Sequence, residues 1–194
     1  MISLEDAQSH VMKSMETLAS ENVHLLQGRN RVITEPIMSN ESIPPFDNTA
    51  VDGYAVKAID TKGAAQEAPI SLTVLETIAA GKPPTFTIQS GECSKIMTGA
   101  PIPDGADAVV MVERTEQKEN ELVVTIKEEV SEGQHIRRSG EDLEPGDLVI
   151  PEGTSLNAAH LGLLASLGIY QIATVRTPTV GIFSTGDELI EGSQ

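Results

Sequence analysis

Cysteine and aromatic residues are scarce in this chain. Its 194 residues include one cysteine, no tryptophan, three phenylalanines and two tyrosines. A single cysteine, Cys93, cannot form a disulfide within the chain, so the fold must depend on its packed core. Free thiols persist in reducing compartments, and we therefore expect this protein in the cytoplasm. No histidine neighbours Cys93 in the sequence, which favours a small buried apolar residue over a nucleophile.

Positive charge is also scarce. The chain has 13 basic and 29 acidic residues, which gives a formal net charge of −16. This balance argues against nucleic acid as a partner, because a nucleic-acid-binding protein needs a basic face. It equally argues against binding to an anionic membrane surface. The N-terminus has no basic run followed by an apolar core, and no stretch approaches the roughly 20 apolar residues that span a bilayer.

The chain does contain enough aliphatic residues for a sizeable core. Apolar residues make up 39% of it, which suffices for one large domain or two small ones. Near the N-terminus, Ser3 with Asp6 resembles a capping box. Apolar residues then recur at helical spacing, at Leu4, Ala7, Val11, Met15 and Leu18. We predict a helix here that faces either the core or a second copy of the chain.

The middle of the chain has the pattern of a β domain. Short apolar or alternating runs, separated by glycine and proline, predict strands at 70–75, 94–97, 109–112 and 121–126. Strands so closely spaced are typical of a small barrel or sandwich. Residues 30–37 are apolar but contain a proline, which predicts an edge strand.

The last third of the chain alternates helix and strand. We predict a helix that is capped by Thr154 or Ser155 and ends before Gly168, followed by strands at 169–175 and 179–183. The second strand runs into a small polar loop, which is how a parallel α/β domain usually opens. We therefore expect these residues to be the front part of a longer protein; the alternative is that the last residues are a tail on the preceding domain.

Familiar catalytic motifs are absent. The sequence has no G-x-G-x-x-G, no G-x-S-x-G and no P-loop, since Gly81-Lys82 is followed by proline. The four histidines have no metal-ligand spacing to one another or to Cys93. What remains is a set of four polar loops that contain or directly precede glycine, at 47–52, 97–101, 136–142 and 184–188.

These loops combine carboxylates, hydroxyls and guanidinium groups with glycine. Glycine allows close backbone approach, and backbone amides can bind an oxyanion. Carboxylates such as Asp47 and Asp52 could hold Mg²⁺, and Arg137 and Arg138 could bind phosphate. The alternative for each loop is a plain turn, for Thr98 a strand cap, and for the arginines a solvated pair.

Taken together, the four loops resemble the signatures of the MoeA family of molybdopterin molybdenumtransferases, to which the gephyrin E domain is related. The matching runs, in the family's order, are PFDNTAVDGYA at 45–55, IMTGAP at 96–101, RRSGED at 137–142 and FSTGDEL at 183–189. Val51 replaces a usual methionine and Thr49 a usual serine. The first and last of these runs lie far apart, so the resemblance extends over most of the chain.

The resemblance implies a function in molybdenum cofactor biosynthesis. Members of this family insert molybdenum from molybdate into adenylylated molybdopterin with release of AMP, and they use Mg²⁺. They are elongated homodimers whose active cleft lies between the third domain of one subunit and the second domain of its partner. The family's third domain continues past residue 194, so these residues alone are expected to lack the full activity.

The resemblance also implies roles for individual residues. Residues at positions implicated in catalysis are Asp52, Thr98, Asp142 and Glu188, of which Asp52 and Asp142 are the expected Mg²⁺ ligands. The expected cofactor-binding residues are Gly99, Arg137, Arg138, Ser184 and Asp187. Thr98 and the neighbouring amides are expected to donate hydrogen bonds to phosphate or molybdate.

The expected fold is α+β and mostly β. A discontinuous first domain of the dimerisation type (1–45 and 138–177) would carry an inserted β-barrel or sandwich-like domain (46–137), and residues 178–194 would open an α/β pterin-binding domain. Two other functions remain open. The chain could be a non-catalytic dimerisation or scaffold module, or residues 46–137 could be a generic barrel carrier, which leaves the other three motifs unexplained.

Overall fold

The computed structural model describes residues 2–117, 121–186, 188 and 190. The chain divides into two compact units, one formed by Ser39–Asp147 and the other by the residues before and after this segment. These bounds differ from the division predicted at 45/46 and 137/138. Residues 39–45 and 142–147 hydrogen-bond to each other, for example Ser39 N to Asp147 O (2.8 Å) and Ile43 N to Leu143 O (2.8 Å), and therefore stay with the β-rich unit.

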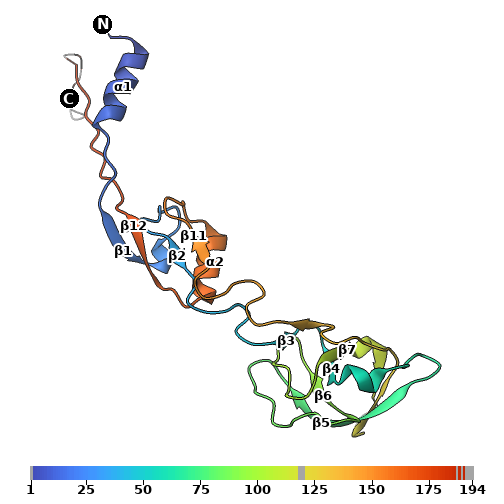
Figure 1. Ribbon diagram of the computed structural model, residues 1–194. Helices are drawn as coiled ribbons and strands as arrows, with labels where there is room; N and C mark the ends of the chain where they lie inside the picture. The colour runs from blue at the N-terminus through green and yellow to red at the C-terminus, as the bar shows by residue number, and fades with distance from the viewer. Residues whose placement is uncertain (1, 118–120, 187, 189, 191–194) are drawn as a thin grey trace. The chain divides into compact units, whose positions relative to one another are not determined.

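The unit outside 39–147 combines helices with two small antiparallel sheets. In Figure 1, β1 and β12 lie side by side as one sheet, and β2 pairs with β11 in the other. The elements are α1 (Leu4–Ser14), β1 (Ser20–His24), the 3₁₀ helix η1 (Leu25–Gln27), β2 (Ile37–Met38), β11 (Leu148–Ile150), α2 (Ala158–Ser166) and β12 (Gln171–Val175).

Helix α1 begins as the sequence predicts. The Ser3 hydroxyl accepts a hydrogen bond from the Asp6 amide at 3.1 Å, which satisfies one of the otherwise unpaired N–H groups of the first turn. None of the residues of α1 is buried in the described part of the chain. Among the described residues α1 therefore does not pack into a core, which leaves the second predicted role, contact with another copy of the chain, as a prediction.

The core of this unit is aliphatic. Its buried residues are Leu25, Ile33, Ile150, Leu156, Leu164 and Ile172. Burial of each such side chain contributes about 1.5–3 kcal/mol relative to exposure. In α2 the cap is Asn157, whose side chain accepts from the His160 amide (3.0 Å), and not Thr154 or Ser155. Gly168 follows the helix with φ = 69°, as predicted for a C-terminal stop.

Two predicted strands differ in the structure. The stretch 30–37 forms only isolated bridges at Val32 and Ile33 before β2 begins at Ile37. Residues 179–183 form no strand, and their apolar side chains Val180, Ile182 and Phe183 are exposed. A strand needs a hydrogen-bonded neighbour, which 179–183 do not have within the described residues.

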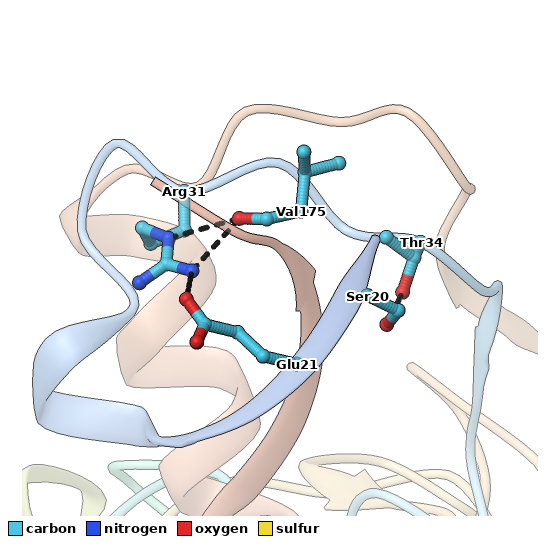
Figure 2. Close-up of polar contacts among 5 residues, drawn as sticks. All are labelled: Ser20, Glu21, Arg31, Thr34 and Val175. Atoms are coloured by element: carbon cyan, nitrogen blue, oxygen red, sulfur yellow. Dashed lines mark hydrogen bonds and ion pairs between the residues drawn. The ribbon is translucent and has the colours of Figure 1, made fainter. Parts of the chain in front are cut away.

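Arg31 ties the end of β12 to β1 (Figure 2). Its guanidinium donates to the carbonyl oxygen of Val175 through Nη2 (2.7 Å) and Nε (3.3 Å), and to Glu21 Oε1 at 2.5 Å. Beside it, the hydroxyls of Ser20 and Thr34 share a hydrogen bond of 2.7 Å. The Arg31 side chain is only 17% exposed, so these bonds act in a partly desolvated place where they are stronger.

The Ser39–Asp147 unit is built on a curled sheet. In the described part of the chain, six strands follow the order β7-β4-β6-β5-β9-β8, with β5 and β6 parallel and the other pairs antiparallel. Their bounds are β4 (Gly53–Val56), β5 (Ile70–Ile78), β6 (Glu92–Ile96), β7 (Ala108–Met111), β8 (Thr115–Glu116) and β9 (Val123–Ile126). The unit also holds η2 (Ala58–Thr61), β3 (Asn48–Thr49) and β10 (Ile136–Arg137).

The sheet is barrel-like because its two outer strands are consecutive in the chain. Strand β7 is at one end of the sheet order and β8 at the other, yet only the 3₁₀ turn η3 (Val112–Arg114) separates them. The sheet must therefore curl until its edges approach each other. The four predicted strands of this region are present as β5, β6, β7 and β9, and the expectation of a mostly β fold is confirmed.

Burial inside this sheet is close to complete. Tyr54, Val56, Cys93, Val110 and Ile126 are at most 1% exposed and belong to one core cluster. Burial raises the pKa of the Cys93 thiol to about 12, so Cys93 is a packing residue and not a nucleophile. None of the helices in the described ranges is both long and apolar enough to cross a membrane.

Of the glycines in the β-rich unit, Gly53 has the least space for a side chain. A Cβ at this residue would lie 2.0 Å from the carbonyl oxygen of Val110 on the neighbouring strand. We predict that Gly53→Ala lowers the free energy of unfolding by about 1–3 kcal/mol, because backbone atoms must move apart. Gly162→Ala, in α2 with nothing within 4 Å, should instead raise it by about 0.5–1 kcal/mol. Calorimetry of both variants measures the difference, and equal stability would contradict the close packing.

Candidate functional site

Three of the four polar loops meet around the short strand β3. Thr49 N donates to Ala100 O (3.1 Å) and Gly99 N donates to Thr49 O (2.9 Å), which joins β3 to the 97–101 loop. Strand β3 also pairs with β10, at the start of the 136–142 loop. Asn48 and Thr49 are buried, so this meeting point is a fixed part of the fold.

The replacement of serine by threonine at position 49 leaves the local hydrogen bonds in place. The Thr49 hydroxyl donates to Val51 O at 2.6 Å and accepts from Val51 N at 3.1 Å. Both bonds need only an oxygen at this position, which serine also supplies. They shape the turn that leads from β3 to Asp52.

Asp52 and Thr98 form the most direct contact between two motifs. Asp52 Oδ1 accepts hydrogen bonds from the amide and from the hydroxyl of Thr98, each at 2.7 Å. The amide and then the hydroxyl hold the pKa of the Asp52 carboxyl below its usual 3.8, so it is ionised at neutral pH. Gly99, with φ = 79°, closes the turn in which Ala100 N donates to Met97 O (2.9 Å).

The 97–101 loop therefore presents acceptors and not donors. The amides of Thr98, Gly99 and Ala100 are all hydrogen-bonded within the chain, and the Thr98 hydroxyl hydrogen points to Asp52. In this arrangement these groups are not free to donate to phosphate or molybdate, contrary to the expectation from the sequence. The open positions are Asp52 Oδ2, which accepts no bond in the described part of the chain, and the lone pairs of the Thr98 hydroxyl.

Both arginines of the 136–142 loop are paired with carboxylates. Arg137 Nη2 lies 2.5 Å from Asp142 Oδ2, and this contact raises the pKa of the Arg137 guanidinium. Arg138 Nη1 lies 2.6 Å from Asp47 Oδ2, and Asp47 Oδ1 accepts from the amide of Ser139 at 2.8 Å. The Ser139 amide and then Arg138 hold the pKa of the Asp47 carboxyl below its usual 3.8.

Asp47, which the sequence indicates only as a possible Mg²⁺ ligand, binds Arg138 in the structure. Nothing in the sequence shows that its carboxylate binds a loop 91 residues away. The available signal was the conjunction of one acidic and one doubly basic loop in the same family pattern. That conjunction could have suggested the ion pair.

The fourth loop belongs to the other unit. Ser184 and Glu188 are exposed and lie in irregular chain. Asp187 lies outside the described residues. The structure thus brings together Asp52 with Thr98, and Arg137 with Asp142, all within the Ser39–Asp147 unit.

The donor set of the site suits a hard cation only in part. Among the residues that the structure describes, no three histidine, cysteine or carboxylate side chains gather into a metal site. Mg²⁺ often takes one or two protein oxygens and completes its shell with water or phosphate. Asp52 Oδ2 and the Thr98 hydroxyl oxygen fit that use. Asp142 fits it less well, because Arg137 already neutralises its charge.

Comparison with known proteins gives one consistent picture. Residues 2–168 match the family described as the MoeA N-terminal region (domain I and II). The chain is 40% identical over 189 residues to molybdopterin molybdenumtransferase 2 of Mycobacterium tuberculosis, with 97% of this chain and 46% of that protein covered. It is 35% identical over 190 residues to the molybdopterin molybdenumtransferase of Staphylococcus epidermidis, with 98% and 45% covered.

Solved structures agree with this. The molybdopterin biosynthesis MoeA protein of Pyrococcus horikoshii OT3 superposes with a TM-score of 0.89 at 36% identity, covering 100% of this chain and 51% of that one. The chain spans about half the length of the relatives it matches. With a family match over most of its length and the same fold as a solved member, the chain belongs to the MoeA family, whose N-terminal region it matches.

Proposed function

We propose that this chain contributes part of the active site of a molybdopterin molybdenumtransferase. The reaction inserts molybdenum from molybdate into adenylylated molybdopterin and releases AMP. The family membership and the printed names of the relatives support this reaction. The Asp52–Thr98 contact, which fixes an ionised carboxylate between two motif loops, is the observation that carries the proposal.

The role of Asp52 follows from its hydrogen bonds. Two donors from Thr98 fix Oδ1, so Oδ2 points its charge in a defined direction and remains able to accept a proton or orient water. A carboxylate fixed before substrate arrives needs no reorganisation during the reaction, which is the main advantage of a preorganised site. Thr98 therefore positions Asp52 and does not itself contact the oxyanion.

Mg²⁺ would bind at this carboxylate. Asp52 Oδ2 and the Thr98 hydroxyl oxygen are the groups that would hold it, together with oxygens from the substrate. When bound, the ion would neutralise charge on phosphate during AMP release. Asp142 would serve as a second ligand only after leaving Arg137, so we assign it first to holding that arginine.

The two arginines supply positive charge for binding anionic substrates. A chain with a net charge of −16 must bind molybdate and phosphate, both anions. Remote surface charge is screened beyond about 8–10 Å, so local cations decide the affinity. Arg137 and Arg138 each use a single guanidinium nitrogen for a side-chain ion pair, which leaves further N–H groups for a ligand.

Substitutions at the Asp52–Thr98 contact test the function. In the full-length protein, Asp52→Asn should lower kcat for molybdenum insertion about a hundredfold, because the charge is lost while the shape is kept. Thr98→Ala should lower it in the same direction, whereas Thr98→Ser keeps the hydroxyl and should stay near the wild-type rate. Thermal unfolding checks that all variants fold. Wild-type rates for both Asp52→Asn and Thr98→Ala would refute the assignment.

The protonation of Asp52 gives a test that does not need turnover. We predict a carboxyl pKa below 3.8 for Asp52, and a partial return toward 3.8 in Thr98→Ala, which keeps the amide donor but loses the hydroxyl. Because the pKa is lowered by folding, the contact stabilises the fold above pH 3.8 and this contribution disappears as the pH falls through the folded pKa. Carboxyl ¹³C chemical shifts measured against pH report both values, and an unshifted Asp52 would contradict the contact.

A second candidate function, a dimerisation module, is favoured by helix α1. Its apolar residues Leu4, Val11 and Met12 are 53–71% exposed, and none of the described residues buries them. A homodimer in which this face packs against a partner would bury them. Both functions can coexist, since the resemblance places the active cleft between subunits. Location in the cytoplasm stays a prediction.

The dimer is tested by charge on the two faces of α1. Val11→Asp puts a carboxylate on the apolar face and should shift the protein from dimer to monomer in light scattering. Ser9→Asp puts the same charge on the opposite face and should leave the mass unchanged. A monomeric wild-type protein, or the same mass for both variants, would exclude a dimer through this helix.

A further inference from the structure

Asp47 connects all three loops of the β-rich unit. Its Oδ2 binds Arg138 Nη1 at 2.6 Å and its Oδ1 accepts from Ser139 N at 2.8 Å. Its main-chain oxygen accepts from Ile102 N at 3.1 Å, just after the 97–101 loop. One residue thus holds the end of the 136–142 loop against the first loop and the end of the second.

The ion pair engages only one part of the Arg138 guanidinium. Nη1 contacts Asp47, whereas Nη2 and Nε have no hydrogen-bond acceptor among the described residues. The Arg138 side chain is 58% exposed and that of Asp47 38%. An arginine held in this way still presents two N–H groups on its free edge, and such an edge binds an oxyanion through two parallel hydrogen bonds.

Holding the side chain has a thermodynamic effect. A free arginine loses rotamer entropy when a ligand immobilises it. The contact with Asp47 already restricts the rotamers of Arg138 in the folded protein, so less side-chain entropy is lost when a ligand binds. The main chain on both sides is fixed as well, since Arg138 N donates to Glu141 Oε2 (3.0 Å) and Gly140 N donates to Pro44 O (3.0 Å).

We propose that Asp47 is a positioning residue that holds Arg138 with its free guanidinium edge turned to an oxyanion of the substrates. This inference rests on the proposed function for the identity of the oxyanion, which is either molybdate or a phosphate of the adenylylated pterin. The two sources share the tetrahedral oxygens that arginine recognises, and separate titrations tell them apart.

A purely repulsive role for Asp47 predicts the opposite sign. If Asp47 were only a negative charge beside the arginine, its neutralisation would strengthen anion binding, because an anion is repelled by the carboxylate and must compete with it for Arg138. If Asp47 positions Arg138, neutralisation weakens binding, because the guanidinium becomes mobile. The direction of the change therefore decides between the two roles.

The test compares Asp47→Asn with a matched substitution elsewhere in the same unit. Asparagine keeps an acceptor for the Ser139 amide and loses only the charge that holds Arg138. Asp60 is the control, since its carboxylate also accepts from a backbone amide, that of Gly91 (2.9 Å), and from a side chain, that of Ser90 (2.9 Å). It lies outside all four motif loops. Asp60→Asn reports what the loss of such a contact does to the fold alone.

Two readouts are needed in the full-length protein. Calorimetric titration with molybdate, and separately with AMP, measures oxyanion affinity without turnover, and steady-state kinetics give KM for each substrate. For Asp47→Asn we expect about tenfold weaker binding of one of the two oxyanions and a matching rise in its KM, with kcat within about twofold. Asp47→Glu, which restores the charge, should recover part of the affinity. Asp60→Asn should change neither.

The outcomes separate this inference from the proposed function. Unchanged or tighter binding of both oxyanions in Asp47→Asn would overturn the positioning role, as would an equal loss in Asp60→Asn. If the wild-type protein fails to insert molybdenum yet binds an oxyanion in a manner that depends on Asp47, the proposed function fails and the positioning role stands.

Discussion

The two backbone hydrogen bonds that Thr49 makes with the 97–101 loop are the constraint on which the site depends. They join the buried strand β3 to the turn at Gly99, and the pairing of β3 with β10 brings the 136–142 loop to the same place. Side chains on these loops then meet because the backbones are already fixed. Asp52 can therefore contact Thr98, and Asp47 can contact Arg138, without a further loss of backbone conformational entropy.

The fold could be predicted where local signals coincide with tertiary contacts. Ser3 and Gly168 act as helix boundaries because capping depends on a few neighbouring atoms. The apolar runs at β5, β6, β7 and β9 form strands because each has a partner in the curled sheet. The run 179–183 is also apolar, but it has no strand partner among the described residues. Asn157, and not Thr154 or Ser155, caps α2 because His160 completes its capping box.

The site could be predicted only as a set of loops. Motif matching found Asp52, Thr98, Arg137 and Asp142, yet it gave no sign that the amides of the second loop are used internally. A sequence does not show whether a hydrogen-bond donor is free or already bonded within the chain. For the same reason the sequence does not reveal the contact of Asp47 with Arg138. The two residues are far apart in the chain, and the pairing of β3 with β10 and the hydrogen bond from Gly140 N to Pro44 O bring them together.

The turn η3 has a consequence for how the β-rich unit behaves among other proteins. Open sheets present a row of unpaired amides and carbonyls at each edge, and such edges recruit strands from other chains. Here the two outer strands are joined by a three-residue turn, and β8 is only two residues long. The outer side of β7 is already hydrogen-bonded to the chain at 133–134, where Val109 N donates to Gln134 O (3.0 Å) and Gly133 N donates to Asp107 O (2.7 Å). A foreign strand therefore finds one edge occupied and the other only two residues long, which protects this unit against aggregation through its edges.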